Sequence, residues 1–301
     1  MPQWLRWILS FAAIMLVALV AGIFLVSSWR INRDYAITID PIRVPESQEA
    51  IDRGRYLADA VNKCTECHGK QLGGEIFIDD PALGRLVASN LTAVEGGVAR
   101  RYTRDDWVRS IRHGVGPDGK PLLFMPAQEY NSLSDADLGA LLAYVKSLPP
   151  VDSDLPDSRV GPLGRLLLLA GRLPLLPAEL IDHDAKPLQA PPRGATADYG
   201  DYLVRTGGCT GCHGDHLSGG PIPGAPPDAP PAGNITPDED SGIGSWSQDD
   251  FIQAMRTGKR PDGSSIDPFM PWKANGRMTD EDLSAIYLAL REVEPREAGG
   301  R

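Results

Sequence analysis

Apolar residues are most concentrated near the amino terminus. No residue from Trp7 to Trp29 is charged, and these 23 residues at about 1.5 Å each would form a helix of about 34 Å, enough to cross a hydrocarbon core of about 30 Å. A cleaved signal peptide is the alternative, but its apolar region would normally be shorter and end in small residues, whereas this run continues past Phe24. We therefore expect residues 1–30 to be an uncleaved membrane anchor.

Helical periodicity dominates the rest of the chain, in two similar stretches, 46–150 and 195–292. Each ends in an amphipathic helix whose leucines recur at helical spacing behind a Ser/Thr-x-x-Asp cap. Helices are expected at 49–62, 103–112 and 134–147 in the first stretch, and around Tyr202-Leu203 and over 278–293 in the second. Long loops join them. The predicted fold class is all-α, with two tandem domains after a transmembrane helix.

The linker between these stretches, residues 151–194, is rich in proline and leucine. Its apolar run, 161–180, is too short and too often broken by proline to span a membrane. One interpretation is a segment packed over the apolar surface between the two domains. The other is an interfacial helix whose leucines enter the headgroup boundary while Arg165 and Arg172 face lipid phosphates.

All four cysteines of the chain lie in two short motifs, CTECH at 64–68 and CTGCH at 209–213. One copy could be a redox dithiol, half of a zinc site, a haem-attachment site or an accident. Two copies that use every cysteine make an accident or a dithiol a poor explanation. A four-cysteine zinc site would not explain a histidine at the same offset in both copies. Covalent attachment of two haem c groups explains the whole pattern.

The chemistry of haem attachment requires these residue types in this order. Two thiols on one helical turn can add to the vinyl groups of a haem, and the next histidine can bind the iron as an axial ligand. The candidate residues are Cys64, Cys67 and His68 for the first haem, and Cys209, Cys212 and His213 for the second.

A methionine follows each motif at the same distance. Met125 and Met270 both lie 57 residues after the motif histidine, and both stand in Phe-Met-Pro. We predict that each is the second axial ligand of its haem, which would close the iron site and raise its reduction potential. His113 is the alternative ligand for the first haem. Its counterpart in the second stretch is Thr257, so a helix-end or surface role is expected.

Two further histidines have no assigned chemistry. His216 is expected to be an exposed loop residue or a neighbour of a haem propionate. His183 lies in the linker, and the sequence suggests no partner for it.

Other landmarks recur between the motifs in both stretches: Asn-(Leu/Ile)-Thr, Arg-x-Gly, Asp-Gly, Phe-Met-Pro and a closing leucine-rich helix. This pattern resembles the class I cytochrome c fold in tandem. The tandem is similar to the cytochrome c subunits of membrane-bound bacterial alcohol and aldehyde dehydrogenases. The resemblance covers roughly residues 46–150 and 195–292, and it implies an electron-transfer protein rather than an enzyme.

The formal net charge of −10 is unevenly distributed. Residues 51–150 carry 12 Lys+Arg and 13 Asp+Glu, whereas residues 195–290 carry 6 and 14. A solvated acidic surface is the simpler explanation. The functional hypothesis is that the second domain attracts a basic acceptor, while the arginines between positions 100 and 112 meet an acidic donor. Nothing in the charge pattern suggests nucleic-acid binding.

The leading hypothesis is a membrane-anchored dihaem cytochrome c. It would pass single electrons from a dehydrogenase or quinol-oxidising complex to a cytochrome oxidase or soluble cytochrome. Because c-type haem is attached outside the bacterial cytoplasm, we expect a single-pass protein of the inner membrane with its haem domains in the periplasm. The alternative is a dihaem enzyme, such as a peroxidase or sulfur-compound dehydrogenase, which would need one open iron position.

Overall fold

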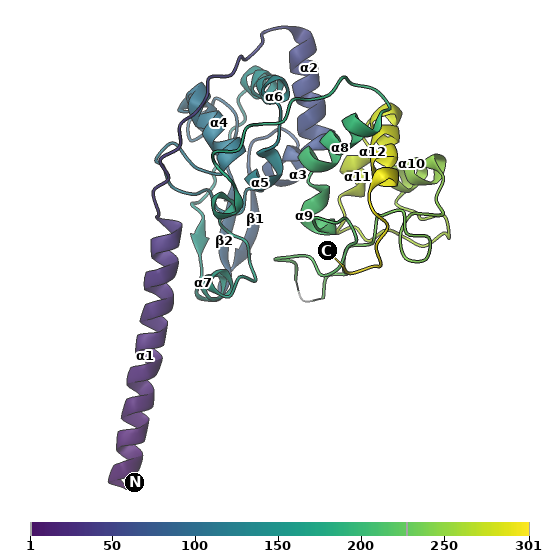
Figure 1. The fold of residues 1–301 in the computed structure, drawn as a ribbon. Helices are drawn as coiled ribbons and strands as arrows, with labels where there is room; N and C mark the ends of the chain where they lie inside the picture. Colours follow the sequence, from purple (N-terminus) through teal and green to yellow (C-terminus); the bar gives the residue numbers. More distant parts are fainter. Residues whose placement is uncertain (1, 227, 301) are drawn as a thin grey trace.

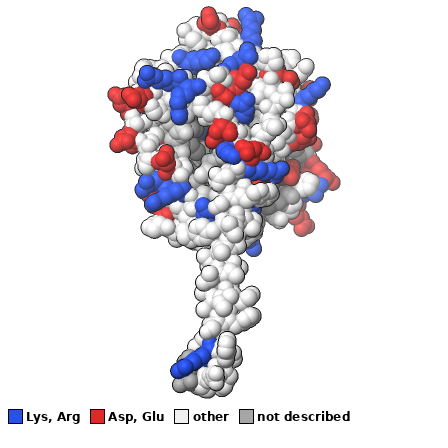
Figure 2. All heavy atoms as spheres, turned by 90° about the vertical axis from the view of Figure 1, so that its left-hand side faces the viewer, with Lys and Arg blue, Asp and Glu red and all other residues white. Residues whose placement is uncertain are grey.

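A single long helix projects from a globular part that contains all other elements (Figure 1). The computed structural model describes residues 2–226 and 228–300. Helix α1 (Gln3–Ile31) is exposed along nearly its whole length. It is the one helix, among the described residues, that is long and apolar enough to cross a membrane. The charged residues of α1 are Arg6 near its free end and Arg30 in its last turn, and Figure 2 shows an uncoloured rod between the free end and the globular part.

The globular part is mostly helical, with two similar sets of elements. The first half contains α2 (Gln48–Tyr56), η1 (Leu57–Val61), α3 (Cys64–His68), η2 (Val98–Arg100), α4 (Arg104–His113), α5 (Ala127–Tyr130) and α6 (Asp135–Ser147). The linker contains α7 (Pro162–Leu169) and η3 (Pro177–Leu180). The second half contains α8 (Ala197–Thr206), α9 (Cys209–His213), α10 (Gln248–Thr257), α11 (Trp272–Asn275) and α12 (Asp280–Glu292).

Each half is built on a crossing of its first and last helices, α2 with α6 and α8 with α12. Both crossings depend on a glycine. A Cβ at Gly54 would collide with the carbonyl oxygen of Ala140, and one at Gly200 would collide with that of Ala285. The predicted caps of α6 and α12 are confirmed, because Ser134 and Thr279 accept hydrogen bonds from backbone N–H groups in the first turn.

The expectation of an exclusively helical fold is wrong in one place. An antiparallel sheet of three strands lies in the first half and linker, with β1 (Glu75–Asp80), β2 (Gly84–Ala88) and β3 (Arg159–Val160) in that order. The sequence of β1, EIFIDD, contains the β-formers Ile and Phe. The third strand comes from the linker, about 70 residues further on, so no local pattern of three strands was visible.

The linker packs mainly on the first half, and its Leu173 and Pro174 also lie beside Gly224 of the second half. Leu168, Leu175 and Leu176 form a small core with Leu86 of β2, and α7 also contacts α1. This part of the linker therefore covers the sheet of the first half beside the end of α1.

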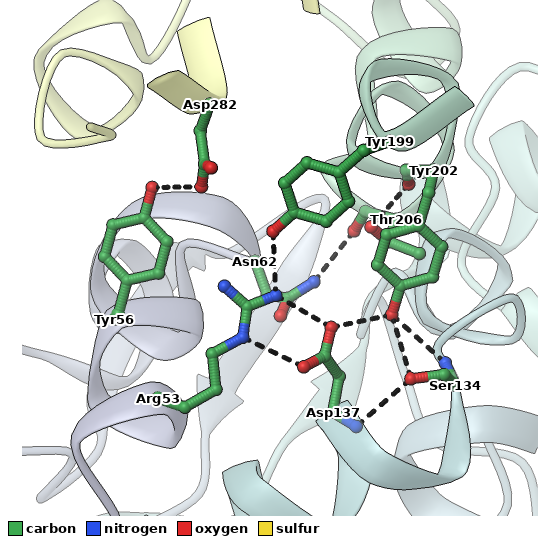
Figure 3. A network of polar contacts seen from close by, with 9 residues as sticks. All are labelled: Arg53, Tyr56, Asn62, Ser134, Asp137, Tyr199, Tyr202, Thr206 and Asp282. Carbon is green, nitrogen blue, oxygen red and sulfur yellow. Dashed lines mark hydrogen bonds and ion pairs between the residues drawn. The ribbon is translucent and has the colours of Figure 1, made fainter. Parts of the chain in front are cut away.

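A reciprocal pair of Tyr–Asp hydrogen bonds joins the two halves (Figure 3). Tyr202 of α8 donates to Asp137 of α6 over 2.8 Å, and Tyr56 of α2 donates to Asp282 of α12 over 2.5 Å. Each tyrosine thus belongs to the first helix of its own half, and its hydroxyl bonds to the last helix of the other half. Such reciprocity is typical of an interface with twofold symmetry.

The two sides of this interface differ in the residue that stands three positions before each tyrosine. Arg53 makes two 2.9 Å hydrogen bonds to the carboxylate of Asp137, and both side chains are buried. Burial alone would raise the pKa of Asp137, but the hydrogen bonds and charge of Arg53 lower it. In the second half Tyr199 stands three residues before Tyr202, as Arg53 stands three before Tyr56. A tyrosine in this place cannot form the equivalent ion pair with Asp282.

The first half contains one more residue than the second between its interface tyrosine and its first cysteine, eight positions against seven. This residue is accommodated by η1, a single π-helical turn in which the Asn62 N–H donates to the Leu57 carbonyl over 2.7 Å. A π turn contains one residue more than an α turn. Both cysteine motifs therefore begin at equivalent places despite the difference in length.

The two candidate haem sites

Each cysteine motif forms one short helix, α3 or α9, entered through a left-handed residue. Lys63 has φ +54° and Gly208 has φ +73°. This conformation turns the chain sharply from the preceding helix, so that both cysteines and the histidine of a motif lie on a single turn. Glycine adopts it readily, whereas a lysine there is uncommon.

All four cysteines carry thiols and none is part of a disulfide. Burial, with a smaller effect of Cys67, raises the pKa of Cys64 to about 12, and burial also raises the pKa of Cys67 and of Cys209. A redox dithiol needs the opposite, a thiol with a lowered pKa. Within residues 2–226 and 228–300, no three His, Cys, Asp or Glu side chains converge as a metal site of protein ligands alone would require. The geometry therefore favours neither the dithiol nor the zinc interpretation.

Both motif histidines are held in the same orientation by a backbone carbonyl. The Nδ1 of His68 lies 2.7 Å from the Ser89 oxygen, and the Nδ1 of His213 lies 2.8 Å from the Gly233 oxygen. Because a carbonyl can only accept, Nδ1 carries the proton and Nε2 keeps its lone pair. This is the usual arrangement around an imidazole that binds a metal through Nε2.

An asparagine fixes the loop that supplies each of these carbonyls. Asn90 accepts from the Thr92 N–H over 2.8 Å and donates to the Val151 carbonyl over 2.7 Å. Asn234 accepts from the Thr236 N–H over 3.0 Å and donates to a carbonyl near the carboxyl terminus, that of Arg296, over 2.7 Å. Sequence reasoning noted the repeated Asn-(Leu/Ile)-Thr but assigned it no role. In both halves the asparagine holds the loop directly after the carbonyl to which the motif histidine is bonded.

The two Phe-Met-Pro loops share one backbone turn. Met125 and Met270 are both half-buried, and the carbonyl of each accepts from the N–H two residues on, over 2.7 Å in both cases. The first loop is tied to its own motif by Tyr130, whose hydroxyl donates to the Asn62 carbonyl over 2.8 Å and whose ring lies near Cys64. Met270 packs at the edge of the shared core, and the helix after it, α11, lies against η1 of the first half.

His113, the alternative ligand for the first haem, contacts another histidine in this structure. It ends α4, is 6% exposed, and its Nδ1 lies 3.1 Å from the Nδ1 of His183. Burial lowers the pKa of His113 to about 4 and also lowers the pKa of His183. The expectation of a helix-end position is correct, but a surface role is wrong, and the linker histidine does have a partner. His216 is exposed, as expected.

The two motifs approach each other through residues that sequence reasoning did not single out. The Asn62 side chain donates to the Thr206 carbonyl over 2.8 Å, and the Lys63 ammonium donates to the carbonyls of Val61 and Gly207. Each of these residues stands within three positions of a cysteine motif. The two halves are thus joined at the places where their haems would be attached.

A half-buried acid, Glu129, lies near this lysine. A Cβ at Gly211, inside the second motif, would lie 2.5 Å from the Glu129 carboxylate, which belongs to α5 of the first half. Burial raises the pKa of Glu129 and lowers the pKa of Lys63. One ionisable pair therefore lies between the two motifs. The repeat does not duplicate this pair, because Gly208 and Ala274 occupy the matching positions of the second half.

These residues fit a covalently bound haem. Each motif offers two thiols on one short helix and an imidazole that keeps its lone pair on Nε2. A haem held there would supply an iron that changes between the ferrous and ferric states. The protein's own contribution is the orientation of the histidine.

Comparison with known proteins agrees with this geometry. Residues 49–145 match the family described as cytochrome c oxidase, cbb3-type, subunit III. The fructose dehydrogenase cytochrome subunit of Gluconobacter japonicus is 29% identical over 285 residues, which cover 87% of this chain and 56% of that protein. The gluconate 2-dehydrogenase cytochrome c subunit of Pantoea cypripedii is 43% identical over 94 residues, 29% of this chain and 21% of the relative.

A third relative is the cytochrome c subunit of alcohol dehydrogenase (quinone) from Gluconobacter oxydans, 39% identical over 102 residues, 32% of this chain and 21% of the relative. The chain thus spans about half the length of the first relative and about a fifth of the other two. The family match, the relatives and the site geometry agree: residues 49–145 are similar to a cytochrome c domain, and the chain is similar to the cytochrome subunits of bacterial dehydrogenases.

Proposed function

We propose that this protein is a dihaem electron carrier that takes single electrons from a dehydrogenase or quinol-oxidising partner and passes them to a cytochrome oxidase or soluble cytochrome. The observation that carries the proposal is the repeated histidine geometry, in which His68 and His213 each donate Nδ1–H to a backbone carbonyl. One haem is attached at Cys64 and Cys67, and the other at Cys209 and Cys212. The cytochrome subunits of fructose, gluconate and alcohol dehydrogenases among the relatives support a dehydrogenase as the donor.

Met125 and Met270 are the proposed second axial ligands. Their equal separation from the motif histidines and their shared backbone turn support this assignment. With histidine and methionine both bound, neither iron has an open position for a substrate, which favours electron transfer over catalysis.

The proposed organisation is an anchor at 1–30, haem domains at 46–150 and 195–292, and a linker at 151–194. Hydrogen bonds that recur in both halves support the two domains, including the histidine–carbonyl and asparagine–threonine contacts described above. The uncharged, exposed surface of α1 supports a single membrane span. Haem attachment outside the cytoplasm would then place the globular part in the bacterial periplasm.

The proposed donor surface needs revision in its details. Arg100 and Arg101 reach the surface, whereas Arg104 and Arg109 each pair with a neighbouring aspartate, Asp105 and Asp106 respectively. Arg112 is buried and donates to the Leu133 carbonyl over 2.8 Å. Arg100 and Arg101 are therefore the arginines best placed to meet an acidic donor.

Ligand-specific spectroscopy tests the proposal. The full-length haem-loaded protein should contain two haems per chain and show the weak charge-transfer band of Met-ligated ferric haem. Met125→Ala and Met270→Ala should each remove half of that band. Met255→Ala is the matched control, because Met255 is a buried core residue of α10. A wild-type band from only one haem would instead indicate an open iron site and a dihaem enzyme.

A further inference from the structure

Helix α7 has one buried and one exposed apolar face. Gly164 and Leu168 are buried against the sheet of the first half. Leu163 and Leu166, on the other side of the helix, are 41% and 47% exposed. Leucines exposed at helical spacing on a helix that is already anchored by its other face are typical of a surface with a partner.

Specific contacts fix α7 beside the last turns of α1. Arg165 donates from Nη1 to the Ser27 hydroxyl over 2.8 Å and to the Ser28 hydroxyl over 2.9 Å, and its guanidinium lies 4.9 Å from the centre of the Phe24 ring. Arg30 of α1 donates in return to the Leu168 carbonyl over 3.2 Å. Arg165 therefore bonds to α1 and does not face lipid, contrary to the expectation from sequence.

The end of α1 marks where its apolar surface stops. No charged residue lies between Arg6 and Arg30, and Trp29, directly before Arg30, is 64% exposed. Tryptophan and the first arginine after an apolar helix are the residues expected at a membrane boundary. Since α7 is bonded to Ser27 and Ser28, it lies within about one turn of that boundary. Figure 1 places α7 on the side of the globular part from which α1 extends.

We propose that α7 lies in the headgroup region of the membrane crossed by α1, as a second attachment of the haem domains to the lipid surface. This inference rests on the proposed membrane span. Lipid is the favoured occupant, because α7 is bonded to the last turns of α1, where Leu25 is 72% exposed, and adds the exposed Leu163 and Leu166 beside them. Exposed Arg172, just beyond the helix, can face lipid phosphates.

The attachment would restrain the orientation of the globular part. A single helix allows rotation about its own axis and tilting at its end, whereas a second contact beside it removes part of that freedom. Helices of this kind insert about 5–10 Å into the headgroup and acyl boundary.

Thiol accessibility in a bilayer tests this placement. Full-length haem-loaded protein carries its native cysteines as thioethers, so Leu166→Cys adds a single reactive thiol. The protein is placed in nanodiscs of phosphatidylethanolamine and phosphatidylglycerol, and the thiol is alkylated with a charged or an uncharged maleimide. Glu49→Cys, at the exposed start of α2, is the aqueous control, and Val17→Cys, in the middle of α1, reports whether α1 spans. The haem spectrum confirms that each variant is folded.

The measured quantity is the rate of alkylation by the charged reagent divided by the rate with the uncharged reagent. We expect this ratio to be much lower for Leu166→Cys than for Glu49→Cys, because lipid excludes the charged reagent. If the two variants behave alike while the thiol of Val17→Cys remains protected from the charged reagent, the span holds and the proposal for α7 is wrong. Slow reaction of Leu166→Cys with both reagents would indicate that protein covers position 166, which also overturns the proposal. Free reaction of Val17→Cys with the charged reagent would overturn the span and the proposal together.

Discussion

The hydroxyl of Tyr202 donates a 2.8 Å hydrogen bond to the carboxylate of Asp137, across the boundary between the two halves of the globular part. The opposite bond, from Tyr56 to Asp282, has the same construction. One apolar core, which contains buried residues of both halves, surrounds these bonds. Side chains of the first and last helices therefore join the two halves directly.

Removing either interface hydroxyl should destabilise the protein. Tyr202→Phe should cost about 1 kcal/mol, because Asp137 keeps its two bonds to Arg53. Tyr56→Phe should cost more, because Asp282 has, among the described residues, no bonds like those of Asp137 to Arg53. The residue at the matching position, Tyr199, is a tyrosine. Denaturant unfolding of the haem-loaded protein measures both free energies. Tyr287→Phe, which removes a bond to the Trp246 carbonyl inside the second half, is the matched control. Equal costs for the two interface variants would contradict the assigned role of Arg53.

Loss of the loop asparagine should loosen the axial histidine. Asn90→Ala leaves the Thr92 N–H and the Val151 carbonyl without their partner, at a cost of about 1–3 kcal/mol. The first haem should remain covalently attached but change its reduction potential, as read by a spectroelectrochemical titration. Asn32→Ala, an exposed asparagine at the end of α1, should change neither quantity. An unchanged potential in Asn90→Ala would show that the carbonyl of Ser89 is held by other contacts.

Replacing the lysine between the motifs should change a haem potential. Removing a positive charge beside a haem makes the ferric state easier to form, so Lys63→Met should lower the potential of the nearer haem by an amount on the order of tens of millivolts. Lys70→Met is a close control, since Lys70 is exposed two residues after the same motif. Both variants remove one charge, so a shift of equal size in the two would indicate a general charge effect and no special role for Lys63.

The buried histidine pair should make the protein sensitive to acid. His113 has a folded-state pKa of about 4, against about 6.5 for a free histidine, so the unfolded chain binds more protons between these values. The stability contributed by the neutral pair is complete above about pH 6.5 and falls as the pH drops towards 4, by roughly 3 kcal/mol in total.

Unfolding measured from pH 7.5 to 4 checks this dependence. His113→Gln should flatten the acid limb, whereas His216→Gln, at an exposed histidine, should leave it unchanged. An acid limb that persists in His113→Gln would assign the loss of stability to other groups.

The features that could be predicted from the sequence are those encoded locally. The caps at Ser134 and Thr279 and the buried leucines of α6 and α12 follow from short-range periodicity, and the structure contains them. The repeat also identified the cysteine motifs and the two methionines as candidates, because it allowed the halves to be compared with each other.

The features that escaped prediction join residues far apart in the chain. His113 and His183 are 70 positions apart, and the contact of Asn62 with Thr206 spans 144. Strand β3 comes from a linker that showed no strand pattern of its own. Neither periodicity nor motif spacing contains information on such pairings. Comparison of the two halves detects only features that occur in both, so it could not indicate a pairing that occurs once, such as that of Lys63 with Glu129.

The π turn at Leu57–Val61 has a consequence for how a duplicated protein can change in length. An extra residue in an ordinary helix rotates everything beyond it by about 100° and shifts it by about 1.5 Å. Such an insertion between Tyr56 and Cys64 would turn either the tyrosine out of the interface or the motif away from its loop. The wider π turn accommodates the extra residue locally. One copy of the repeat can therefore be longer than the other, while both keep their tyrosine in the interface and their cysteine motif in the same place.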